Sequence, residues 1–144
     1  LSASTQIIPI IDLTESAEGS NLRQDLQTSL SHASVTTFNV SNATTTVITT
    51  TGYFRVFGNY SSNNNNAGSH AGQVLLNDGS TDKIIYQINN ANHATENSLA
   101  VTFDFIVFLS AGDSLKIATN TTDTLMKGCT RQIATIDGVL VNPN

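Results

Sequence analysis

The segment VTFDFIVFLSAGDSLKIAT, residues 101–119, consists of two apolar runs separated by a glycine-containing turn. The first run is long, rich in Phe, Val and Ile, and has no helical period, which is typical of a β-strand. The residues SAGDS at 110–114 supply the Gly and Asp that favour a tight reversal of the chain. The segment therefore predicts two consecutive β-strands joined by a short turn.

The first of these strands carries large apolar side chains on both faces. One face holds Val101, Phe103, Phe105, Val107 and Leu109, and the other holds Thr102, Asp104, Ile106 and Phe108. The segment GYFRVFGNY at 52–60 repeats this pattern, because Tyr53 and Phe57 alternate with Phe54 and Val56. A strand at the surface of a monomeric sandwich alternates apolar with polar residues.

The second apolar face therefore needs a cover. A long loop, the N-terminal arm or another copy of the chain could supply it. We favour another copy, because oligomer interfaces resemble a core cut in half.

The segments that predict strands recur from residue 34 onward, and turn residues separate them. They are 34–40, 45–51, 52–60, 72–78, 83–89, 99–109, 114–119 and 124–135, followed by a final pair around Asp137-Gly138. About eight short strands at this spacing indicate a β-sandwich or a barrel. The chain has 144 residues, which suits one such domain.

The composition narrows the classes of partner. Charged residues make up only 12% of the chain, the formal net charge is −5, and the six Lys and Arg residues are scattered. Nucleic acid and membrane surfaces both attract clustered basic charge, so neither is an expected partner. No apolar run is long enough for a membrane-spanning helix, and no signal peptide is visible. The single Cys129 excludes an internal disulfide and fits a small buried hydrophobe better than a nucleophile.

Residues 1–33 differ from the rest and are expected to form an arm that precedes a domain at 34–144. The segment STQIIPIIDLTES at 4–16 is apolar but broken by Pro9, which predicts an extended arm or an edge strand. Leu22, Leu26 and Leu30 then share one face of a predicted short helix. This region is either a connector packed on the domain or an arm that reaches a neighbouring subunit.

Two segments rich in Asn and Ser predict polar loops, at 59–72 and 89–98. Such a loop is either a solvated connection or a site for a sugar or protein partner. The candidate ligand residues in the first loop are Tyr60, Asn63, Asn64 and His70.

The sequence shows no recognisable catalytic or metal-binding pattern, so the protein is predicted to be no enzyme and to need no cofactor or metal. His32, His70 and His93 are far apart and lack ligand spacing. Asp104 lies within an apolar strand, where Arg55 or Arg131 could neutralise it.

Two segments resemble a known family. GYFRVFG at 52–58 and FIVFLSAGDSLKIAT at 105–119 resemble strands of the C1q and tumour-necrosis-factor-like jelly rolls. The polar strand chemistry and the ending CTRQIATIDGVLVNPN at 129–144 resemble small virion proteins of tailed bacteriophages. The resemblance implies an antiparallel jelly roll of about eight strands that assembles as a homotrimer. It also implies a structural virion protein, of the decoration or cement type, that binds the major capsid protein.

The resemblance also gives roles to particular residues. The capsid contact would come from the N-terminal arm, through Ile7, Ile8, Pro9, Ile10, Ile11 and Leu13. The core and the trimer contacts would come from the aromatic strands, through Tyr53, Phe54, Phe57, Phe105 and Phe108. The alternative function is the head of a phage fibre, which would bind a glycan or a host receptor through the loops.

Overall fold

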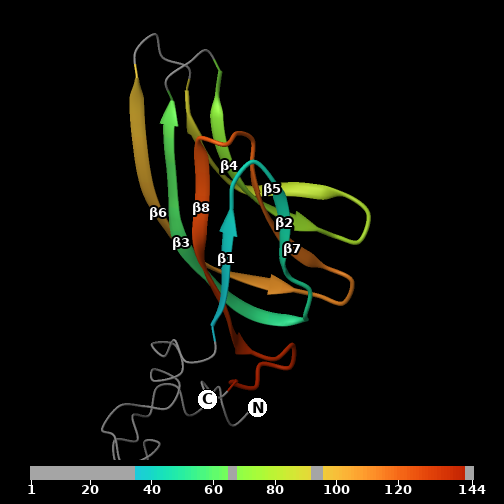
Figure 1. The fold of residues 1–144 in the computed structure, drawn as a ribbon. Helices are drawn as coiled ribbons and strands as arrows, with labels where there is room; N and C mark the ends of the chain where they lie inside the picture. The colour runs from blue at the N-terminus through green and yellow to red at the C-terminus, as the bar shows by residue number, and fades with distance from the viewer. Residues whose placement is uncertain (1–34, 65–67, 92–95, 142–144) are drawn as a thin grey trace, which may run out of the picture.

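The computed structural model describes residues 35–64, 68–91 and 96–141, and these residues form eight β-strands and no helix. The strands in Figure 1 are β1 (Thr36–Val40), β2 (Thr44–Ile48), β3 (Gly52–Asn64), β4 (His70–Asn77), β5 (Asp82–Asn90), β6 (Asn97–Leu109), β7 (Ser114–Thr119) and β8 (Thr124–Ala134). Each overlaps one of the eight segments predicted from the sequence. The all-β prediction is therefore confirmed.

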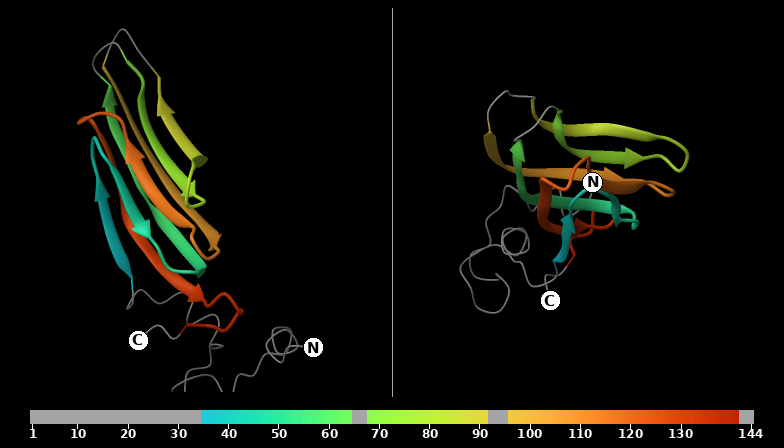
Figure 2. Two further views of the ribbon diagram at one scale, coloured as in Figure 1. Left: turned by 90° about the vertical axis from the view of Figure 1, so that its right-hand side faces the viewer. Right: turned by 45° about the horizontal axis from the view of Figure 1, so that its top comes forward.

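The strands form two antiparallel sheets that stack into a sandwich (Figures 1 and 2). The first sheet has the order β1-β8-β3-β6, and the second has the order β2-β7-β4-β5. Every connection crosses from one sheet to the other except the β4–β5 hairpin, which is the connectivity of a jelly roll. The predicted jelly-roll sandwich is therefore confirmed.

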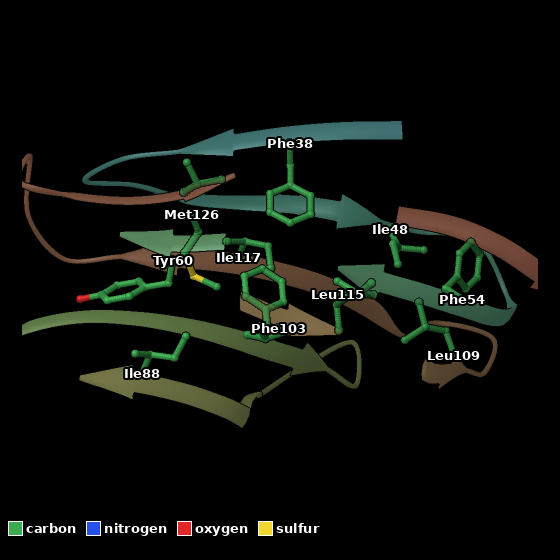
Figure 3. Close-up of a cluster of buried hydrophobic side chains, with 13 residues drawn as sticks. Phe38, Ile48, Phe54, Tyr60, Ile88, Phe103, Leu109, Leu115, Ile117 and Met126 are labelled. Carbon is green, nitrogen blue, oxygen red and sulfur yellow. The ribbon is translucent and has the colours of Figure 1, made fainter. Parts of the chain in front are cut away.

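The hydrophobic core lies between the two sheets, as Figure 3 shows. Its most deeply buried apolar side chains have no exposed surface, and they are Val56, Tyr60, Val74, Leu109, Leu115, Ile117 and Met126. Each fully buried aliphatic side chain stabilises the fold by about 1.5–3 kcal/mol relative to exposure. The burial of these apolar side chains therefore stabilises the fold without a disulfide.

Two glycines allow β3 and β8 to approach closely in the middle of the first sheet. Gly58 pairs with Gly128, and a Cβ on Gly128 would overlap the Phe57 carbonyl oxygen and lie 2.7 Å from the Gly58 Cα. The rings of Phe38 and Phe103 cover this pair from the core side and stack with their centroids 6.4 Å apart. The aromatic rings fill the space that two side chains would otherwise occupy.

The antiparallel register gives the sandwich two distinct ends. We call one of them the entry end, because β1 begins and β8 ends there. The turns β2–β3, β4–β5 and β6–β7 lie at the same end. At the opposite end, which we call the far end, β3 and β5 finish and β4 and β6 begin. Asn120 ties this far end together, because its Nδ2 donates to the Ser69 carbonyl oxygen at 2.7 Å while its Oδ1 accepts from the Ala71 amide at 2.8 Å.

The predicted Asp137-Gly138 turn is present at the entry end. The Gly138 amide donates to the Thr135 carbonyl oxygen at 2.9 Å, and Gly138 has a φ of 80°, which favours glycine. A single bridge joins Ala134 to Leu140, so the expected final pair of strands is reduced to one contact. We call residues 135–141 the C-terminal turn.

Candidate functional site

The strands β5 and β6 form one long edge of the sandwich, because each is the last strand of its sheet. Three rings pack beneath this edge: the Tyr86 centroid lies 6.0 Å from those of Phe103 and Phe105, which are 6.3 Å apart. An edge strand also presents a row of backbone groups that its own sheet does not pair. The edge therefore combines an apolar base with open backbone.

Large apolar side chains are exposed along this edge and on the adjoining outer face of the first sheet. We call this set the apolar edge, and its members, with their exposed fractions, are Tyr53 (39%), Ile84 (55%), Ile85 (43%), Ile106 (64%) and Phe108 (43%). The Tyr53 and Phe108 rings face each other with centroids 4.8 Å apart. A monomeric surface rarely exposes a large apolar patch, so neighbouring exposed apolar side chains make this edge a candidate interaction site.

A β-bulge in β5 explains why two neighbouring isoleucines are both exposed. Val74 of β4 pairs with Tyr86 and Leu75 pairs with Ile84, so Ile85 has no partner in the ladder. The strand alternation is broken at this point, and a bulge re-aims the side chains around it. Regular alternation would have turned one of the two isoleucines toward the core.

An open groove lies between the two edge strands. It has a volume of about 510 Å³ and is lined by Ile85 and Tyr86 of β5 and by residues 102–106 of β6. Most of its lining residues are aromatic or aliphatic, and Thr102 and Asp104 add polar groups. The groove is suited to an apolar side chain from another surface.

An ion pair is fixed beside the apolar edge. Arg55 of β3 donates to both carboxylate oxygens of Asp104, from Nε at 3.0 Å and from Nη2 at 2.7 Å. The guanidinium also lies 4.7 Å from the centre of the Phe57 ring. The hydrogen bonds raise the pKa of Arg55 and lower the pKa of Asp104, so both groups stay charged and paired. Of the two arginines proposed from the sequence, Arg55 is the one that neutralises Asp104.

The predicted aromatic residues fall on two faces, as their alternation requires. Phe54 lies in the core, and Phe105 is partly buried against it. Tyr53 and Phe108 point outward and belong to the apolar edge, while Phe57 points outward and is half-buried beside Arg55. The strands are therefore apolar on both faces.

Three residues of the apolar edge were absent from the predicted site: Ile84, Ile85 and Ile106. Ile106 was visible on the second face of its strand, next to Phe108, and could have been included on that signal. The two isoleucines of β5 could not, because no sequence feature marks the bulge.

The predicted ligand loop at 59–72 is wrong over most of its length. β3 continues to Asn64 and β4 begins at His70, and the second predicted loop at 89–98 is likewise shortened by β5 and β6. Tyr60 and Asn64 have no exposed surface and His70 is 2% exposed, so none of them can meet a ligand from solvent. Among the four candidates, only Asn63 is exposed.

The physical reason is that the polar residues at the far end face inward and bond to each other. The Asn64 side-chain amide donates to the carbonyl oxygens of Gly68, Asn90 and Ala91 at 2.9–3.2 Å, and Tyr60 donates to the His70 carbonyl oxygen at 2.6 Å. Burial raises the pKa of Tyr60, which keeps the hydroxyl a donor. Hydrogen bonds thus take the place of apolar packing at this end.

The predicted arm cannot be compared with the structure. The arm residues Ile7, Ile8, Pro9, Ile10, Ile11 and Leu13 lie outside the described residues. Within the described ranges, no three His, Cys, Asp or Glu side chains gather where they could hold a metal ion, and no helix is long and apolar enough to cross a membrane. Cys129 is half-buried on β8.

No protein-family model matches the chain, and neither does any curated protein. Among solved structures, a pentameric capsid protein isolated from metagenomic phage sequences has a TM-score of 0.71 and 38% sequence identity, covering 95% of this chain and 83% of its own. A second structure of such a protein, solved by iodide phasing, has the same TM-score and identity and covers 95% of this chain and 86% of its own. Eiger TNF from S. frugiperda aligns over 65% of this chain and 82% of its own, with a TM-score of 0.44 and 11% identity.

Proposed function

This chain belongs to the family of these phage capsid proteins, and from that premise we propose that it is a decoration or cement protein that binds the phage head as a homopentamer. The family gives the protein a structural role in the virion and not an enzymatic one. The observation that carries the proposal is the 38% identity over 95% of the chain with capsid proteins described as pentameric.

The apolar edge supports self-association independently of the relatives. Its exposed side chains include the Tyr53–Phe108 ring pair and, at the groove, Ile85 and Ile106, and a stable interface needs such apolar side chains at its centre. We propose five copies on the basis of the relatives. A homotrimer, which the resemblance to C1q and TNF-like jelly rolls implies, is the competing assembly.

A fivefold ring fits one kind of position on a capsid of icosahedral symmetry, the vertex. Five equivalent contacts form together only where the underlying lattice has the same fivefold symmetry, and linked contacts increase the overall avidity. We therefore propose that the protein decorates the vertices. A trimer would match the threefold positions instead.

The contact with the major capsid protein is proposed to come from residues 1–33, which precede the β-sandwich at 34–144. The apolar residues between Ile7 and Leu13 are the proposed anchor. The described chain begins at the entry end, next to the start of β1, so the arm would leave every subunit of a ring on the same side. Five arms would then reach the capsid together.

The first experiment is the native mass of the purified full-length chain, with binding to heads that lack it. We expect a species of five times the 15.3 kDa chain mass, and added density at the vertices of decorated heads. A species of three times the chain mass with density at threefold positions would replace the pentamer with the trimer. A monomer at micromolar concentration would refute self-association.

The second experiment tests the arm in the full-length chain. The double substitution Ile8→Asp and Ile10→Asp should leave the native mass unchanged and abolish binding to heads. A matched control changes Leu22→Asp, outside the anchor. Retained binding by the double variant would show that the anchor lies elsewhere.

A further inference from the structure

We infer that the C-terminal turn of one copy packs against the apolar edge of the next copy in the ring. This inference rests on the pentameric assembly proposed above, and it names the two surfaces that form the contact. The turn comprises residues 135–141, and the edge is centred on Ile106 of β6.

A closed ring of identical subunits needs two different surfaces on each subunit. A twofold contact joins a patch to itself and ends at a dimer, whereas a head-to-tail contact joins one patch to another and closes into a ring. The apolar edge is one such patch. The surface that meets it must lie elsewhere on the same chain.

The exposed large apolar side chains of the described residues come from two parts of the chain, which approach each other where Tyr53 pairs with Ala134. The first is the apolar edge, on β3, β5 and β6. The second is the C-terminal turn, whose exposed residues are Ile136 (45%), Val139 (63%) and Leu140 (43%). The turn is therefore the one remaining concentration of exposed apolar residues in the described ranges that could complete a head-to-tail contact.

The C-terminal turn has a defined backbone that presents these side chains. The Thr135 amide donates to the Val139 carbonyl oxygen at 2.8 Å, and the Val141 amide donates to the Ile133 carbonyl oxygen at 2.8 Å. The Val139 amide in turn donates to the Thr135 hydroxyl oxygen at 3.2 Å. A surface ordered before binding loses less conformational entropy when it docks.

The chemistry of the two surfaces is complementary. The groove between β5 and β6 is open, about 510 Å³ in volume, and lined mainly by aromatic and aliphatic residues, so it can accept the aliphatic side chains of the turn. The nearby charges of Arg55 and Asp104 already neutralise each other across two hydrogen bonds. Docking therefore brings no unpaired charge of this ion pair into the interface, which would be strongly unfavourable.

The opposite long edge is a poor alternative to the turn. The exposed residues of β1 and β2 are Thr36, Thr37, Asn39, Thr44, Thr45 and Thr46, whose hydroxyl and amide groups are hydrated in the free subunit. Burying them against isoleucine and phenylalanine would leave polar groups without partners. The apolar edge is matched by the apolar turn.

The test uses two full-length variants, Ile106→Glu on the edge and Val139→Glu on the turn, with Thr46→Glu on β2 as the matched control. The three side chains are exposed, so the substitutions should leave the fold and the circular dichroism spectrum unchanged. Each of the first two variants should be monomeric where the wild type is pentameric, with contact affinity at least about 30-fold weaker. The Thr46→Glu control should stay pentameric.

Mixing the two monomeric variants gives the decisive result. Ile106→Glu retains an intact turn and Val139→Glu retains an intact edge, so a one-to-one mixture holds one complete contact. Sedimentation velocity should detect a heterodimer that cannot grow into a ring. A mixture that stays monomeric, or either single variant that stays pentameric, would overturn the inference.

The outcomes also separate this inference from the proposed function. A wild-type chain that is not pentameric would refute the assembly itself, whereas a pentameric wild type with pentameric variants would refute only the assigned surfaces. If a glutamate variant unfolds, Ile106→Ser and Val139→Ser take its place. Serine removes the same apolar contact without introducing a charge.

Discussion

The two long edges of the sandwich are equally open in the order of the strands, yet they differ in the apolar surface that they expose. The exposed residues of β1 and β2 are threonines and Asn39, whereas β5 and β6 expose isoleucines and Phe108 among polar residues such as Lys83 and Thr102. Both edges belong to the same core and flank the same two sheets. We propose that the difference reflects what each edge meets outside the subunit.

An open edge is a hazard for any β-protein, because its backbone can pair with another chain. A threonine-rich edge stays compatible with water through its hydroxyl groups. The exposed isoleucines of the β5–β6 edge have no hydroxyl groups, so covering them in an assembly removes apolar surface from water and is favourable. The contrast supports the proposed role of the β5–β6 edge in assembly.

The largest effect is expected from a substitution in the centre of the first sheet, which supports both edges. We expect Gly128→Ala to lower the free energy of unfolding by about 3 kcal/mol, because the new Cβ would strike the backbone of β3 and cannot be accommodated by a side-chain shift. Thermal unfolding measures the effect. Gly112→Ser is a control at a position where a Cβ meets nothing, although its φ of 88° adds local strain. Equal melting temperatures for Gly128→Ala and the wild type would contradict the close approach.

A milder change should separate the two edges. Phe108→Ser removes an aromatic side chain from the apolar edge, and we expect it to weaken the contact between subunits by about 2 kcal/mol, or roughly 30-fold. Thr37→Ser on β1 should leave assembly unchanged. Dilution series by native mass spectrometry would measure both. Equal effects of the two substitutions would remove the distinction between the edges.

The far end should affect the β5–β6 edge through hydrogen bonds instead of apolar contact. Asn64→Ala removes donors to three carbonyl oxygens, two of them at the end of β5, and should lower the free energy of unfolding by about 1–2 kcal/mol. Amide hydrogen exchange should accelerate in β5 more than in β2. The neighbouring exposed Asn63→Ala is the matched control, and protection in β5 that matches the control would refute this role.

The smallest effect concerns the ion pair at the rim of the apolar edge. Asp104→Asn should lower the free energy of unfolding by less than about 1 kcal/mol at neutral pH, because the pair is largely exposed. Arg55 lowers the pKa of Asp104, so the wild-type advantage is complete above the unfolded value of about 3.9 and disappears as the pH falls through the folded value. Denaturant titrations of both proteins between neutral and acid pH would measure it. An advantage that grows on acidification would contradict the pairing.

Much of the fold could be predicted from the sequence because β-strands alternate. The two faces of the segment around Phe103 and Phe108 were assigned correctly from the alternation alone. The far end could not be predicted, because Ser62, Asn64 and Asn90 look like loop residues until their hydrogen-bond partners on other strands are known. The sequence shows the alternation of a strand. It does not show which distant residues will form the hydrogen bonds that make the burial of an amide side chain favourable.

The candidate site was predictable in outline but not in its residues. Alternation indicated that Phe108 needs a cover, but the bulge that exposes Ile85 depends on the register between β4 and β5. The number of copies could not be predicted from the sequence pattern either. An exposed apolar face indicates that a partner covers it, but it does not fix the angle between the two subunits. That angle alone distinguishes a ring of five from a ring of three.

The described chain enters β1 and leaves its final turn at the same end of the sandwich. If residues 1–33 hold the subunit on the head, the far end of the sandwich, where β3 finishes and β4 begins, points away from the particle. A foreign peptide inserted between Asn64 and His70 would then be displayed outward in five closely spaced copies per ring. The same polarity would place Val141, at the end of the C-terminal turn, toward the shell.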